Sequence, residues 1–153
     1  MILSLDTTVW IDLVRRRDPG VTACFSEATL SQATMVVSTL VLHELESGLV
    51  AARSSERRRV QLATLLAQAT VADFSPEDSR SSGALRAGLR AAGTPIGEID
   101  TLIGGQALAR GWTVVTRNVR HFGRVEGLAL IDWSVGSDPL SPEVIAARVE
   151  AKA

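Results

Sequence analysis

The sequence predicts an α/β fold: a three-layer α/β/α sandwich around a short, mainly parallel sheet of five strands. Short apolar or β-branched runs alternate along the chain with stretches whose apolar residues recur at helical spacing. Parallel strands need a crossover connection between them, so this alternation favours a parallel sheet with helices on both faces. The 153 residues, 46% of them hydrophobic and 22% charged, are enough for one domain with a sizeable core.

The first strand is expected at residues 2–5, an apolar run that ends at Asp6. The stretch from Val9 to Val14 has its apolar side chains on one side of a helix. Turn residues at positions 18–20 end this helix, and the proline among them lies near the start of a second helix at residues 21–30.

The second strand is expected at residues 35–38, where two valines give a β-branched run. Ser38 or Thr39 can cap the helix that follows, whose apolar residues run from Val41 to Leu49. Either of two consecutive serines then caps a further helix over residues 54–69.

A third strand is expected at residues 70–74. Residues 75–78, Ser-Pro-Glu-Asp, are a strong helix start because they supply a cap, a proline in the first turn and two acids, and this helix should stop at Gly93. The next helix, residues 98–110, contains the pair Gly104–Gly105, which weakens a helix. We therefore expect the backbone of a neighbouring element to approach this pair closely.

The last two strands are expected at residues 112–116 and 128–131, with a short turn or helix at residues 118–122 between them. A small C-terminal helix begins at Ser141-Pro142-Glu143. The chain should therefore consist of one domain, residues 1–133, and a C-terminal extension with a short helix, residues 134–153.

Three acids are expected to meet at one edge of this sheet. Ligands of open parallel sheets bind beyond the carboxyl ends of the strands. Asp6 directly follows the first strand, Glu44 lies in the second turn of the helix after the second strand, and Asp100 lies in the first turn of the helix before the fourth. All three stand beside apolar residues, where a carboxylate needs compensation.

Oxygen ligands without paired Cys or His suit a hard cation, so the three acids predict a site for Mg²⁺ or Mn²⁺. Each acid also has a simpler interpretation when taken alone. Asp6 could cap the first helix, Glu44 could be a solvated helix residue, and Asp100 could interact with a helix dipole. Their joint position at the strand ends favours the metal site.

Several other classes of protein are disfavoured. The chain has no long apolar run or basic leader, which predicts a protein without a membrane span or signal peptide. Cys24 is the only cysteine, so no intrachain disulfide forms and a cytoplasmic location is expected. Phosphate-loop, dinucleotide-binding and H-E-x-x-H motifs are missing. The two histidines, His43 and His121, are expected at the surface or in packing.

Four short motifs occur in an order and spacing that resemble the PIN-domain ribonucleases, and within them the VapC-type toxins of prokaryotic toxin–antitoxin modules. The match runs from Met1 to about Trp133. The motifs are Leu5-Asp6-Thr7-Thr8-Val9-Trp10-Ile11-Asp12, Glu44-Leu45-x-x-Gly48, Pro95-Ile96-Gly97-x-x-Asp100-x-x-Ile103 and Val114-Val115-Thr116-Arg117-Asn118-x-x-x-Phe122.

The resemblance implies that Asp6, Glu44 and Asp100 are the acidic metal-binding residues and that Thr116 is a supporting hydroxyl. It also implies Mg²⁺- or Mn²⁺-dependent hydrolysis of RNA, a homodimer and inhibition by a VapB-type antitoxin. Asn118 stands where many members have a fourth acid, and an amide binds a divalent ion less strongly than a carboxylate. Thr8 stands where the family often has Asn, and it could instead cap the first helix. Glu98 is left out of the core site because residues two apart on a helix do not share a face.

A basic stretch accompanies the fourth strand. Although the net charge is −1, no acid lies between Thr101 and Val125, and this stretch holds four arginines. Arg117, Arg120 and Arg124 are candidates for binding RNA phosphates, and a solvated basic face is the alternative.

The residues alone are also compatible with other functions. A phosphotransfer domain also places an acid after the first strand, but a receiver would need a lysine near the last strands and the only one is Lys152. An aspartyl phosphatase would need an acid at the position of Thr8. A PIN nuclease of RNA maturation or a non-catalytic interaction module are further alternatives.

Overall fold

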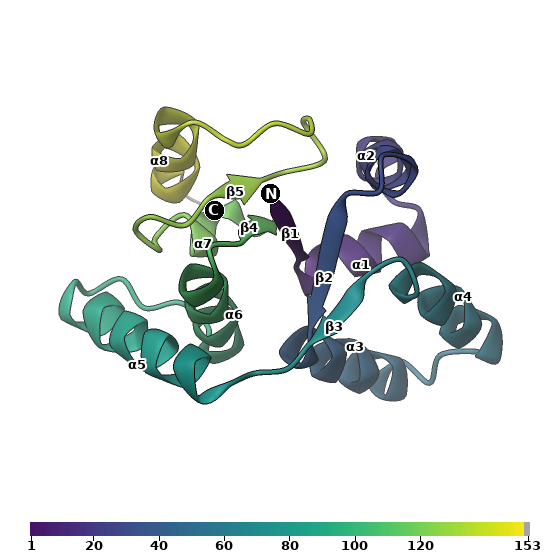
Figure 1. The fold of residues 1–153 in the computed structure, drawn as a ribbon, viewed down its shortest axis with the longest axis horizontal. Helices are drawn as coiled ribbons and strands as arrows, with labels where there is room; N and C mark the ends of the chain where they lie inside the picture. Colours follow the sequence, from purple (N-terminus) through teal and green to yellow (C-terminus); the bar gives the residue numbers. More distant parts are fainter. Residues whose placement is uncertain (152–153) are drawn as a thin grey trace.

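The predicted α/β fold is confirmed. The computed structural model, which describes residues 1–151, contains a five-stranded parallel sheet flanked by helices (Figure 1). The strand order is β3-β2-β1-β4-β5, so the first strand lies at the centre and pairs with both β2 and β4. The strands are β1 (Ile2–Leu5), β2 (Thr34–Ser38), β3 (Thr70–Ala72), β4 (Thr113–Val115) and β5 (Leu130–Ile131).

Helices lie on both sides of the sheet. In Figure 1, α1, α2 and α4 are to the right of the strands and α5, α6 and α7 are to their left. None of the helices within residues 1–151 is long and apolar enough to cross a membrane. The helices are α1 (Thr7–Arg15), α2 (Pro19–Leu30), α3 (Thr39–Ala51), α4 (Glu56–Leu66), α5 (Pro76–Ala91), α6 (Glu98–Arg110), α7 (Val119–Phe122) and α8 (Pro142–Glu150).

The helix starts follow the capping residues of the sequence. The Ser38 side chain accepts from the Leu40 N–H at the start of α3, so Ser38 is the cap and Thr39 is the first helical residue. Ser55, the second of the two serines, caps α4. At α5 the expected start is a full capping box, in which Ser75 and Asp78 each accept from the other's backbone N–H.

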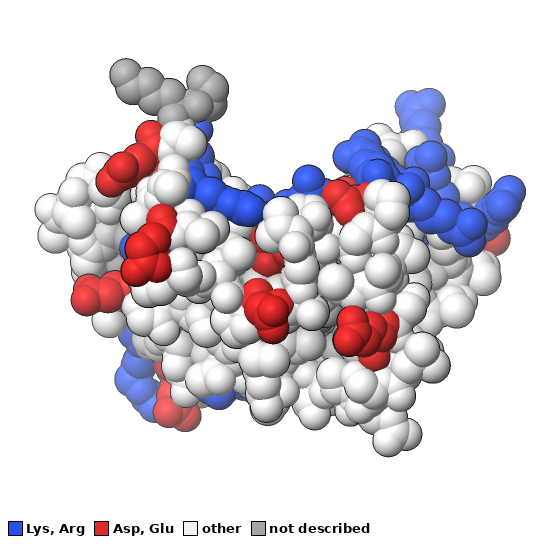
Figure 2. Space-filling view, turned by 90° about the horizontal axis from the view of Figure 1, so that it is seen from above, with Lys and Arg blue, Asp and Glu red and all other residues white. Residues whose placement is uncertain are grey.

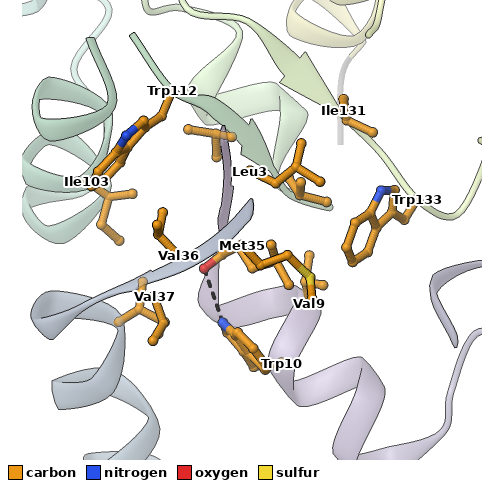
Figure 3. Packing of buried hydrophobic residues seen from close by; sticks show 14 of the residues in the cluster. Leu3, Val9, Trp10, Met35, Val36, Val37, Ile103, Trp112, Ile131 and Trp133 are labelled. Carbon is orange, nitrogen blue, oxygen red and sulfur yellow. Dashed lines mark hydrogen bonds between the residues drawn. The ribbon is translucent and has the colours of Figure 1, made fainter. Parts of the chain in front are cut away.

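The core is built on both faces of β1. Leu5 and Trp10 are fully buried, and the Trp10 indole N–H donates to the Leu5 carbonyl at 3.2 Å (Figure 3). Phe25 of α2 stacks edge-on between the rings of Trp10 and Trp133, at 5.9 and 6.4 Å between centroids. These aromatic contacts join α1 and α2 to the segment that follows β5.

Helices α5 and α6 pack with their backbones in close approach, as the glycine pair predicts. A Cβ built on Gly105 would lie 2.3 Å from the Ser82 Cα, whereas one on Gly104 would make ordinary contacts at 3.5 Å. Arg110 of α6 donates to both oxygens of the buried Asp78 at 3.0 and 2.6 Å. Burial alone would raise the pKa of Asp78, but these hydrogen bonds and those of Ser75 hold it at about 2.

The C-terminal extension docks on the rest of the chain. The expected helix is present as α8, and it packs against α7 at Gly123, where an added Cβ would lie within 2.8 Å of both Ile145 and Val149. Arg148 of α8 donates to the buried Asp132 at 2.5 Å. The division between domain and extension at residue 133 stays a prediction.

Candidate active site

Asp6 and Thr116 lie side by side because β1 and β4 are paired. Leu5 is in register with Val115, and the Asp6 N–H donates to the Val115 carbonyl at 3.0 Å. The next residue of each strand therefore extends from the same edge of the sheet. Asp6 occupies the N-cap position of α1, but its side chain makes no cap hydrogen bond. Instead its Oδ2 accepts from the Thr116 hydroxyl at 2.8 Å and from the Thr8 hydroxyl at 2.9 Å.

Glu44 reaches the same edge from α3. This helix begins directly after β2, the other neighbour of β1, so its second turn lies near the start of α1. The Thr7 hydroxyl donates to Glu44 Oε2. Because Thr7 is adjacent to Asp6 in the chain, this contact fixes Glu44 one residue away from Asp6.

Asp100 comes from the first turn of α6 and is held by the segment after β4. Its Oδ2 accepts from the Asn118 side-chain amide at 3.0 Å and contacts His121 Nδ1 at 2.7 Å. The Asn118 backbone N–H donates in turn to the Thr116 hydroxyl at 2.9 Å. Thr116 therefore bonds both to Asp6 and to the residue that holds Asp100, which connects the two acids.

The electrostatics of Asp6 are those of a buried anion beside another anion. Only 3% of Asp6 is exposed, and burial raises the pKa of its carboxyl. Hydrogen bonds from Thr116 and Thr8 oppose this effect, while the charge of Asp100 adds to it. No cationic side chain within residues 1–151 forms an ion pair with Asp6.

The donor chemistry fits a hard divalent cation. The side-chain hydrogen bonds to each of the three acids reach one carboxylate oxygen, Oδ2 of Asp6 and Asp100 and Oε2 of Glu44. The second oxygen of each is then a candidate ligand, in an all-oxygen set of the kind that Mg²⁺ and Mn²⁺ prefer. Within residues 1–151 no three His, Cys, Asp or Glu side chains already stand at mutual metal-binding distance. Asp100 is near enough for its charge to act on Asp6, and Glu44 accepts a hydrogen bond from Thr7, the neighbour of Asp6 in the chain.

The three arginines proposed from the sequence have different surroundings. Arg117 Nη1 donates to Asp12 at 2.8 Å and to Asp18 at 3.2 Å, and its Nε lies 3.8 Å from Asp132. Arg124 donates to the Pro95 carbonyl at 3.0 Å, and Arg120 is exposed. That these residues bind RNA stays a prediction, and for Arg117 three carboxylates compete with phosphate.

The sequence did not predict that His121 contacts Asp100 or that Thr7 contacts Glu44. His121 was expected at the surface or in packing, yet its ring contacts Asp100. The spacing of three residues between Asn118 and His121 could have predicted this contact, because it brings both side chains to one face of a short helix. Thr8 was considered as a helix cap, but it instead donates to Asp6 and accepts from the Arg117 N–H. Glu98 pairs with Arg86.

Comparisons with known proteins identify the family of this chain. The family model of the PIN domain matches residues 3–128. A protein of Shigella flexneri named tRNA(fMet)-specific endonuclease VapC is 33% identical over 130 residues, covering 85% of this chain and 96% of that protein. Ribonuclease VapC2 of Rickettsia felis is 31% identical over 133 residues, covering 87% and 98%.

A solved structure shares the fold as well. The crystal structure of VapBC2 from Rickettsia felis bound to a DNA fragment from its promoter superposes with a TM-score of 0.79 at 28% identity, covering 86% of this chain and 98% of that one. The chain belongs to the PIN-domain family and, within it, to the VapC group.

Proposed function

We propose that the protein is the endoribonuclease toxin of a type II toxin–antitoxin pair and that it hydrolyses RNA phosphodiester bonds with Mg²⁺ or Mn²⁺. The observation that carries this proposal is the buried Asp6 beside Asp100, with no basic side chain of residues 1–151 paired to Asp6. A pair of anions in this environment is stabilised by a bound cation. The names of the VapC relatives, an endonuclease and a ribonuclease, support the reaction class.

Asp6, Glu44 and Asp100 would hold the metal ion. When bound, a divalent ion activates water and neutralises charge on the scissile phosphate. Thr116 and Thr8 orient the Asp6 carboxylate through its Oδ2. Asn118 and His121 orient Asp100 in the same way, which would leave its other oxygen available to the ion.

RNA, a VapB-type antitoxin and a second copy of the chain are the proposed partners. The relative from Shigella flexneri is named for tRNA(fMet), which supports a tRNA as the substrate class. Bases in a single-stranded loop of such an RNA can be splayed out for recognition. The solved relative from Rickettsia felis is a VapBC2 assembly, which supports the antitoxin. We place this pair in the cytoplasm, where its RNA substrates are found.

A cleavage assay tests the proposal. An initiator tRNA transcript is incubated with the wild-type chain, Asp6→Asn or Asp100→Asn in Mn²⁺, in Mg²⁺ and in EDTA. We expect cleavage only with metal, and a fall of about a hundredfold or more in both variants, since each removes a ligand of the ion. Asp138→Asn, an exposed acid in the loop before α8, is the matched control and should cleave at the wild-type rate.

Wild-type cleavage by Asp6→Asn would contradict the metal site. RNA binding without hydrolysis in either metal would favour the interaction module. A toxin also stops growth when it is expressed alone and not when a VapB-type antitoxin is expressed with it. A nuclease of RNA maturation would show no such dependence.

A further inference from the structure

A second charged surface lies outside the acidic site, between the end of α1 and the start of α4. It is a hollow of about 630 Å³. Its charged residues are all arginines: Arg15 at the end of α1, Arg16 directly after it, and Arg57 and Arg58 from α4. The remaining lining residues, Val14, Ser55, Val60 and Gln61, carry no charge. We call these four arginines the α1–α4 arginine surface.

The four guanidinium groups are exposed and lack counter-charges. Within residues 1–151, none of them has a carboxylate oxygen within 4 Å, whereas Arg110, Arg117 and Arg148 are all paired with aspartates. Figure 2 shows arginine side chains, in blue, gathered at its upper right, at the end of the molecule where Figure 1 places α4. Arginine stays charged at every physiological pH, so four of them around one hollow attract an anion.

A groove connects this surface to the acidic site. A smaller hollow between α1, α3 and α4 shares Val14, Arg15 and Arg58 with the first one, and Glu44 is part of its lining. The two hollows together therefore extend from the arginines along α1 to Glu44. Arg17 and Arg117 line another hollow, which contains Thr8, but Asp12 and Asp18 belong to the same lining and balance their charge.

The backbone at two helix ends gives independent support. Arg16 and Arg53 follow α1 and α3 with φ of 49° and 46°, in the left-handed region where glycine is the usual residue. Arg16 lines the large hollow, and Arg53 lies between two residues, Ala52 and Ser54, that line the smaller one. Helix termination alone does not call for a long cationic side chain, so arginine at these positions points to a role for its charge.

We propose that the α1–α4 arginine surface binds the phosphate backbone of the RNA whose scissile bond lies at the acidic site. The inference rests on the proposed function and extends it to the path of the substrate. Guanidinium groups match phosphate with two parallel hydrogen bonds, and phosphate contacts are made mostly by such side chains.

Salt-dependent binding tests the proposal. The affinity of an initiator tRNA transcript is measured by fluorescence anisotropy over a series of salt concentrations, in the Asp6→Asn background so that no RNA is cleaved. The test variants are Arg16→Gly and the double variant Arg57→Gln/Arg58→Gln. We expect the slope of log K against log salt to fall by roughly 0.7 to 0.9 for each phosphate contact removed.

Two matched controls separate charge from backbone effects. Arg80→Gln removes an exposed arginine of α5 and should leave the slope unchanged. Gln32 is the third non-glycine residue in the left-handed region, with φ of 54°, and it is exposed and uncharged. Gln32→Gly relieves the same backbone strain without removing a charge, so it should also leave the slope unchanged. Because glycine adopts the left-handed conformation of position 16 more readily than arginine, Arg16→Gly should melt no lower than its parent. A change in its RNA binding would then not be due to a loss of stability.

In the wild-type background, the double variant should raise KM for RNA cleavage and leave kcat unchanged. Slopes equal to that of Arg80→Gln would overturn the proposal. Unchanged slopes together with weaker binding of a VapB-type antitoxin would also overturn it and assign the surface to a protein. Changed slopes in a protein that cleaves no RNA in Mn²⁺ would support the RNA surface and reject the proposed nuclease function.

Discussion

Asp6 is the residue at which folding and function make opposite demands. The fold buries its carboxylate beside Asp100, and both burial and this neighbouring charge raise its pKa. A group with a raised pKa in the folded state destabilises the protein as the pH rises above its ordinary value of 3.8, and the full cost is present once the folded carboxyl has ionised. Without metal, the charge of Asp6 therefore lowers the free energy of unfolding.

We predict that Asp6→Asn melts at the same temperature as the wild type or higher in EDTA at neutral pH. The difference should narrow as the pH falls toward 4, because the wild-type carboxyl then takes up a proton. Adding Mg²⁺ at a hundred times its dissociation constant should stabilise only the wild type, by about 2.7 kcal/mol. Differential scanning calorimetry at several pH values measures both effects. A lower melting temperature for Asp6→Asn in EDTA would show that its ionised carboxylate stabilises the fold.

How much of the site was predictable depends on how each residue is positioned. Asp6 could be placed at the edge of the sheet from the sequence because it directly follows the first strand, whereas Thr116 was expected as the last residue of the fourth strand and is instead the first residue after it. Asp100 and Asn118 could be placed near Asp6, because Asp100 lies in the first turn of the helix before the fourth strand and Asn118 lies just after that strand. The three carboxylates around Arg117 could not be predicted, since they come from a helix, a cap and a loop whose side-chain directions depend on packing.

At the scale of elements, the packing of α5 on α6 depends on one of two adjacent glycines. Gly105 faces the backbone of α5 at Ser82, and Gly104 faces flexible side chains at ordinary distances. We predict that Gly105→Ala destabilises the protein by about 1 to 3 kcal/mol or more, because the helices must move apart. Gly104→Ala should be neutral or stabilising by up to about 1 kcal/mol, since alanine favours the helix.

Urea unfolding of the two variants tests this difference directly. Equal losses of stability in both would mean that the pair acts through helix geometry and not through the contact with Ser82. The close approach could be predicted from the sequence, because two glycines weaken a helix and are tolerated where a neighbouring backbone needs the space. The partner could not be predicted, because the sequence does not show which helix packs there.

The element boundaries show a similar limit. Helix starts were predicted within a residue or two where a serine cap is present, as at Ser38 and Ser75. Strand ends were predicted too long: β3 ends at Ala72 and not at residue 74, and β4 ends at Val115. Thr116, the residue after β4, donates a hydrogen bond to Asp6. The hydrophobic pattern alone does not show whether such a residue is the last of the strand or the first of the loop.

At the scale of the whole molecule, the apolar helix faces are mostly covered within the chain. Val41 and Leu45 of α3 and Leu62 of α4 are buried in the core of a single copy and are not available to a second one. The homodimer stays a prediction that rests on the resemblance to the VapC-type toxins. We expect a particle of twice 16.3 kDa in sedimentation equilibrium at micromolar concentration. A mass of 16.3 kDa at that concentration would contradict it, and the buried core then explains why one copy folds alone.

The central position of β1 has a consequence for how the protein is made. A ribosome that has synthesised residues 1–95 has supplied Asp6 and Glu44, yet β4 and Asp100 do not exist, and one side of β1 has no partner strand. Pairings this distant along the chain form late, because the intervening loop must close first. A nascent chain thus cannot assemble the acidic site until nearly all of the sheet has been translated. The strand order thus delays completion of the acidic site until residues beyond β4 have emerged from the ribosome.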